Sequence, residues 1–97
     1  MALVERVLLL NPDLTATQAK VLPANPVRKH ALFVNDSDAI AYLSLGSPAA
    51  ANQGIRLNAS GGSYELNVTN LYHGDIYAIS VGATKRLCIT EVSLVSE

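Results

Sequence analysis

The chain has 97 residues, of which 49% are hydrophobic and 15% are charged, and its seven basic and eight acidic residues leave a formal net charge of −1. This is the length of one domain, which buries only about 60–65% of the surface that its unfolded chain exposes. The balanced charge argues against nucleic-acid binding, and no segment approaches the roughly 20 apolar residues that a membrane helix needs. Because the mean hydropathy of +0.25 is high for so small a protein, we expect a homo-oligomer, a dimer or a trimer, that buries apolar surface between its copies.

The N-terminal segment contains an apolar run, Leu3 to Leu10, interrupted by one acidic and one basic residue. The run fits either a strand or one short helix, and Asn11-Pro12-Asp13 ends it in both cases. No small-residue cleavage site follows, so we do not expect a signal peptide. We interpret residues 1–21 as an N-terminal arm or the first strands, and residues 22–97 as a β-sandwich domain, in a single domain overall.

Farther along the chain, the recurring signal is an alternation of apolar and polar residues bounded by turn residues. Strands are predicted, in chain order, at residues 17–22, 29–35, 39–45, 53–57, 63–69, 75–81 and 86–92. The clearest alternation is in residues 63–69, where Tyr64, Leu66 and Val68 share one face. Pro48 to Ala51 is interpreted as a loop or a single turn, because so short an alanine-rich run does not form a stable helix alone. Seven or eight short strands predict an all-β fold, an antiparallel β-sandwich or a small barrel.

Residue types that carry catalytic or metal chemistry are few and scattered. His30 and His73 are the only histidines. Neither has a ligand spacing such as H-x-H, and a metal site would need them to converge with carboxylates such as Asp75 or Asp36. The single cysteine, Cys88, lies between two aliphatic residues, which indicates a buried thiol rather than a nucleophile. We therefore predict no enzyme, no catalytic residues, no cofactor and no metal.

Interface residues are a more promising prediction. Tyrosines combine a large contact area with a polar tip, which suits interfaces as well as strands in general. Arg28 follows two prolines and is expected either to bond a carboxylate or a backbone carbonyl or to be exposed. The candidate interface residues are Leu3, Val7, Leu9, Arg28, Tyr42, Tyr72 and Tyr77.

Turn glycines and core positions recur in several segments. Leu22-Pro23-Ala24-Asn25-Pro26-Val27-Arg28 leads into a strand, and Ala31 to Ser37 is a strand that closes with Asn-x-Ser. The pattern continues in four further segments, residues 41–46, 54–57, 61–66 and 74–79. Over roughly residues 22–92 the chain resembles a family of small virion-associated proteins of tailed bacteriophages. The resemblance implies a β-sandwich and a place in a phage particle, without a defined site.

The resemblance leads us to expect a non-enzymatic virion structural protein, a capsid cement or decoration protein that stabilises the shell by contacts bridging its subunits. The expected partner is the major capsid protein or another virion protein, and the expected location is the virion, assembled in the host cytoplasm. No binding to nucleic acid or to a membrane is expected. Two alternatives stay open: a neck or tail accessory protein, and a carbohydrate-binding β-sandwich module, which the absence of tryptophan disfavours.

Overall fold

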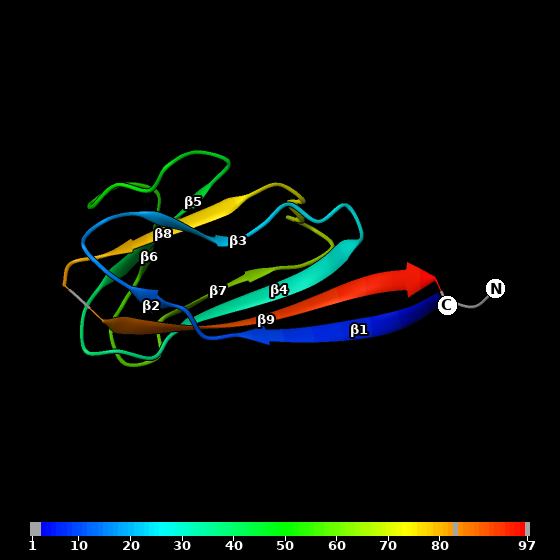
Figure 1. The fold of residues 1–97 in the computed structure, drawn as a ribbon, viewed down its shortest axis with the longest axis horizontal. Helices are drawn as coiled ribbons and strands as arrows, with labels where there is room; N and C mark the ends of the chain where they lie inside the picture. The colour runs from blue at the N-terminus through cyan, green and yellow to red at the C-terminus, as the bar shows by residue number, and fades with distance from the viewer. Residues whose placement is uncertain (1–2, 83, 97) are drawn as a thin grey trace.

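Two antiparallel β-sheets face each other in the computed structural model, which describes residues 3–82 and 84–96 (Figure 1). One sheet has the strand order β1-β9-β4-β7, with the short β2 also paired to β9, and the other has the order β3-β8-β5-β6. In chain order the strands are β1 (Leu3–Leu10), β2 (Asp13–Leu14), β3 (Ala19–Leu22), β4 (Arg28–Asn35), β5 (Ala41–Leu45), β6 (Ile55–Leu57), β7 (Ser63–Leu66), β8 (Ile76–Ser80) and β9 (Lys85–Ser96). The predicted all-β sandwich is confirmed, with nine strands in place of seven or eight.

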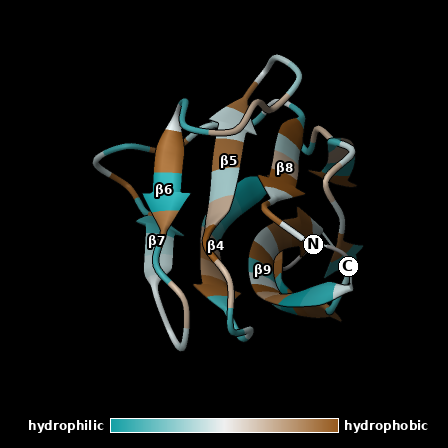
Figure 2. Cartoon of the chain, turned by 90° about the vertical axis from the view of Figure 1, so that its left-hand side faces the viewer, coloured by the Kyte–Doolittle hydropathy of each residue, from teal (hydrophilic) through white to brown (hydrophobic). Residues whose placement is uncertain are grey.

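The hydrophobic core lies between the two sheets. Figure 2 looks along the strands and shows β6, β5 and β8 above β7, β4 and β9. On β4, side chains alternate between two faces: Ala31 and Phe33 are completely buried, whereas Leu32 and Val34 are half-buried on the opposite face. The described residues contain no helix long and apolar enough to cross a membrane.

One strand is shorter than the sequence predicts. The alternation in residues 63–69 predicts that Val68 lies on the same face as Leu66, but β7 ends at Leu66 and Val68 is 86% exposed. The cause is a side-chain turn: the Thr69 amide donates to Asn67 Oδ1 at 2.9 Å, and the Asn67 amide donates to Asn70 Oδ1 at 2.8 Å. Asparagine side chains compete in this way with the strand ladder.

Another strand is longer than predicted. β9 continues past residue 92 to Ser96, because all eight residues of β1 pair with its second part, from Leu3 opposite Ser96 to Leu10 opposite Ile89. Of the strand and the helix considered for Leu3–Leu10, the strand forms. We call β1 together with Ile89–Ser96 of β9 the ribbon. It projects beyond the ends of the neighbouring strands (Figure 1) and elongates the molecule to 46 Å, against 22 and 21 Å in the other directions.

Candidate functional site

The ribbon concentrates exposed apolar side chains. Every residue of β1 except the last is exposed, and Leu3, Val7 and Leu9 are 63%, 59% and 66% accessible. The other exposed aliphatic residues on the ribbon are Val4, Leu8 and Leu94. Single exposed hydrophobic residues are ordinary on a protein surface, but a contiguous group is typical of an interaction site.

The two faces of β1 have different surroundings. Strand alternation places Leu3, Glu5, Val7 and Leu9 on the face turned away from the other sheet, which we call the outer face. The opposite face carries Val4, Arg6, Leu8 and Leu10, of which Leu10 packs against the core. β1 therefore contacts the core at one end only.

The outer face continues across the sheet as an apolar surface with paired charges. From β9 and β4 it includes Cys88, Thr90, Val92, Leu94, Leu32 and Val34. Lys29 on β4 bonds to Glu5 on β1, and His30 lies 2.7 Å from Glu65 on β7. The hydrogen bond from Lys29, reinforced by its positive charge, lowers the pKa of the Glu5 carboxyl. The charges of Lys29 and Glu5 thus neutralise each other within the chain, which leaves the aliphatic surface around them for contact.

Cys88 departs from its prediction. It is half-buried on the outer face, whereas the sequence indicated a buried thiol. The reason is alternation, because Leu87 and Ile89 on either side take the inward positions and are 0% and 1% exposed.

The inward face of the ribbon forms a hollow of about 260 Å³. It is lined by Arg6, Leu8, Asn25, Val27, Glu91, Ser93 and Val95. Its floor is polar and closely bonded, since Asn25 Nδ2 donates to Ser93 Oγ at 2.7 Å and to Glu91 Oε2 at 3.2 Å. Its walls are the aliphatic residues of the ribbon.

A buried arginine fixes the base of the ribbon. Arg28 is 1% exposed, and its Nε donates to Glu91 Oε2 at 2.7 Å. Its Nη1 donates to the carbonyls of Tyr72 and Gly74, and its Nη2 donates to the carbonyl of Pro23. A guanidinium is suited to this role because it presents five donors in a fixed plane. The three connected segments, β9, the loop before β4 and the loop before β8, form a rigid support for the ribbon.

The open edges of the two sheets differ in how they are protected. β3 has only four residues, including Lys20 and a register shift, and β6 has three. On β7, the side chain of Asn70 bonds the carbonyl of Glu65 at 3.0 Å. Short strands, lysines, bulges and side-chain caps are ways in which proteins block edge-to-edge pairing. β1 has eight residues and an unshifted register with β9, so its outer edge is the longest regular edge in the molecule.

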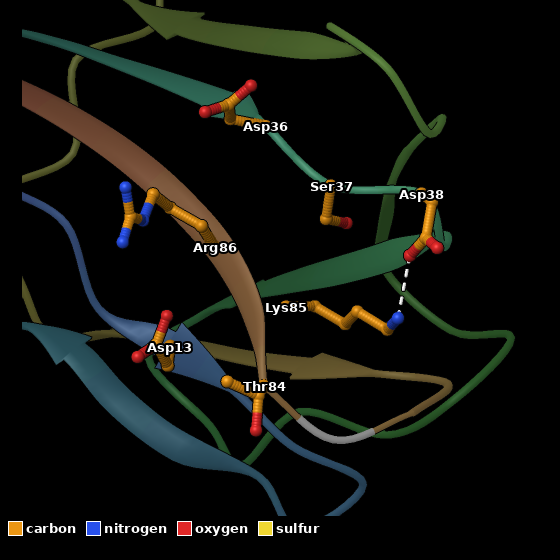
Figure 3. A pocket seen from close by; sticks show the side chains of 7 residues that line it. All are labelled: Asp13, Asp36, Ser37, Asp38, Thr84, Lys85 and Arg86. Atoms are coloured by element: carbon orange, nitrogen blue, oxygen red, sulfur yellow. Dashed lines mark hydrogen bonds and ion pairs between the residues drawn. The ribbon is translucent and has the colours of Figure 1, made fainter.

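A second hollow lies where β2, the start of β9 and the loop after β4 meet (Figure 3). Its volume is about 310 Å³, and its lining consists of Asp13, Asp36, Ser37, Asp38, Thr84, Lys85 and Arg86. Lys85 Nζ donates to Asp38 Oδ1 at 2.6 Å, which lowers the pKa of Asp38. This hollow is an ion-paired loop surface. Within residues 3–82 and 84–96, no three histidine, cysteine or carboxylate residues are grouped as metal ligands.

The predicted interface residues fall into three groups. Leu3, Val7 and Leu9 all lie on the outer face of β1, and their role as interface residues stays a prediction. Arg28 and Tyr42 are buried within the chain, at 1% and 6% exposure, and of the two alternatives for Arg28 the structure shows bonding to a carboxylate and to carbonyls. Tyr72 and Tyr77 are partly buried, and Tyr72 packs against the core.

The sequence reasoning missed Leu8 and Glu91 on the inward face of the ribbon and Leu94 on its outer face. A signal for Leu8 was present, since it belongs to the same apolar run as Leu9. Glu91 had no local signal, because its partner Arg28 is 63 positions away in the chain.

Comparison with protein-family models, curated proteins and solved structures found no match to this chain. Its function must therefore be inferred from its own residues and geometry.

Proposed function

We propose that this chain is a virion structural protein of a tailed bacteriophage, a non-enzymatic capsid cement or decoration protein that stabilises the shell by contacts bridging its subunits. The observation that carries the proposal is the ribbon, an eight-residue strand with an open edge and exposed aliphatic side chains on a small rigid sandwich. The resemblance of residues 22–92 to small virion-associated proteins supplies the phage setting. The partner is the major capsid protein or another virion protein.

The size of the exposed surface suits this role. On the outer face of the ribbon, the exposed residues Leu3, Val7, Leu9 and Leu94 leave on the order of 400 Å² accessible, which is within the range of the largest patch on an ordinary monomer. One such contact gives modest affinity. Many copies on a symmetric shell act together, because subunits already fixed in a lattice present their sites at high effective concentration.

Quantitative mass spectrometry of purified particles of the phage that encodes this chain tests the proposal. We expect a copy number comparable to that of the major shell protein. Particles assembled without the chain are expected to release their DNA at a lower temperature than complete particles. Absence of the chain from purified particles would overturn the proposal.

The same measurement distinguishes the neck or tail alternative, in which the chain is present in only a few copies, as one ring. The carbohydrate-binding alternative has less support. Tyr42 is buried and the other three tyrosines are partly buried, whereas sugar recognition by stacking requires open aromatic faces.

A further inference from the structure

We infer that the outer edge of β1 binds β1 of a second copy of this chain, antiparallel, about a two-fold axis that is perpendicular to the sheet and passes midway between the two copies of Val7, which we call an axis at Val7. The inference deepens the proposed function, on which it rests for its biological setting, by naming the first partner of the ribbon. The assembling unit is then a two-fold dimer whose two five-stranded sheets are continuous.

The first support is the regularity of the edge. β1 uses one side of its backbone to pair with β9 in an unbroken register from Leu3 to Leu10. The other side presents alternate amide and carbonyl groups to solvent. An antiparallel edge is complementary to its own copy after a rotation of 180°, which is the condition for an isologous dimer.

The second support is charge, which selects the register. A two-fold axis perpendicular to the sheet keeps the outer faces of both copies on the same side, and it places one residue of β1 directly opposite its own copy. An axis at Arg6 places two guanidinium groups directly opposite each other, and an axis at Glu5 does the same with two carboxylates. Like charges in directly opposite positions are unfavourable.

An axis at Val7 avoids both conflicts. Glu5 then lies opposite Leu9 of the second copy, and Arg6 lies opposite Leu8. The paired segment extends from Val4 to Leu10, whereas an axis at Leu8 shortens it by two residues.

The third support is the apolar character of the edge. β1 exposes Leu3, Val4, Val7, Leu8 and Leu9. Pairing with a second copy removes the open main chain of β1 and the flanks of these side chains from water, together with the aliphatic stem of Arg6. The two hollows under the ribbons would lie side by side, on the same face of the joined sheet.

Light scattering of the purified full chain over a concentration series tests the association. We expect a dimer, and we expect Val7→Lys to raise its dissociation constant at least about tenfold, because two lysines are brought directly opposite each other. Val81→Lys is the matched control, since Val81 is 57% exposed and lies in the loop after β8, at the other end of the molecule from the ribbon tip. It should leave the dimer unchanged.

Cysteine cross-linking tests the register in a Cys88→Ala background. In the Val7 register, the two Val7 Cα atoms are about 4.5–5.5 Å apart, within the range that a disulfide spans. Val7→Cys should therefore form a disulfide dimer on mild oxidation. Leu9→Cys is the control on the same face, because its two copies are separated by roughly 14 Å, and it should not cross-link.

A monomer or a trimer at all concentrations, or equal cross-linking of Val7→Cys and Leu9→Cys, would overturn the inference. If Val7→Lys fails to fold, as judged by circular dichroism, the cross-linking pair still decides the register. Both tests use the purified chain without particles. A dimer that is absent from virions therefore overturns only the proposed function, and a monomer that is abundant in virions overturns only the present inference.

Discussion

The closed sandwich and the ribbon are built from the same residue types, and Leu43 and Leu9 illustrate the contrast. Leu43 on β5 has strands on both sides and is 0% exposed, whereas Leu9 on β1 has a strand on one side only and is 66% exposed. Both belong to apolar strand segments. Edge position alone does not explain the difference, because Leu66 on the edge strand β7 is 0% exposed. The difference teaches that a strand residue is buried when the other sheet covers its face, and Leu9 lies on the outer face, where its side chain stays available to another molecule.

Two arginines, one buried and one exposed, show the same contrast for charged side chains. Arg28 belongs to the base of the ribbon and is buried with four hydrogen-bonded partners. Arg6 lies on the exposed part of β1 and lines the hollow beneath the ribbon. The buried base of the ribbon thus includes a charged pair, Arg28 with Glu91, whereas the exposed part of the ribbon presents mainly aliphatic side chains.

The largest expected effect on stability comes from removing the buried arginine. Arg28→Ala should reduce the free energy of unfolding by about 3–5 kcal/mol, because it leaves Glu91 as an uncompensated buried charge. Urea denaturation measures the loss, and Arg6→Ala is the control, with an expected change within about 0.5 kcal/mol. A double variant, Arg28→Met with Glu91→Leu, should recover only part of the loss, since the carbonyls bonded by Arg28 still lack donors. A loss below about 1 kcal/mol for Arg28→Ala would show that the base of the ribbon does not depend on this pair.

The next prediction compares the stability lost when Leu43 or Leu9 is replaced by alanine. Leu43→Ala should cost about 2–5 kcal/mol, because it opens a cavity between the sheets. Leu9→Ala should change the stability of the monomer by no more than about 0.5 kcal/mol. Thermal unfolding of dilute protein measures both, since dilution keeps self-association out of the comparison. Similar losses for both variants would mean that β1 is covered within the chain itself.

The smallest effect concerns pH and the ion pair on the outer face. The pKa of Glu5 is lowered in the folded chain by Lys29, so the pair contributes stability above the unfolded value of 4.5, and this contribution is lost as the pH falls through the lowered folded value. Glu5→Gln should therefore be slightly less stable than the parent chain at about pH 7 and equally stable at about pH 3. Both side chains are largely exposed, so salt should reduce the difference. A difference that persists at low pH would point to a contact other than this pair.

Much of the fold was predictable from local pattern. On β4 the alternation separates Ala31 and Phe33 from Leu32 and Val34, and on β8 it separates Ile76 from Tyr77. Both faces of each strand are apolar, so the pattern defines the two faces and the structure shows which one is buried. Such patterns are readable because a strand with one covered face must alternate. The misplaced end of β7 has a local cause as well, because the side chain of Asn67 competes with the ladder, and a strand pattern alone does not predict that competition.

The candidate site was predictable only in part. The apolar character of Leu3, Val7 and Leu9, in a segment outside the resemblance, predicts them as interface residues, and the structure places all three on one face. Arg28 and Tyr42 are predicted as interface residues from their residue types alone, and both are buried within the chain. Burial of an arginine depends on a carboxylate and several carbonyls that come from distant parts of the chain, and no local pattern reports such partners.

The sequence by itself determined the all-β class, most of the strands from residue 17 onward and the absence of a strong charge field, because these follow from residue periodicity and composition. Only the tertiary structure decided that β1 pairs with β9 at the edge of its sheet, that Glu91 is the partner of Arg28, and that the ribbon is exposed. These outcomes depend on which strands become neighbours. That choice is made by contacts between residues far apart in the chain, and the local sequence of β1 is compatible with a central position as well as with an edge.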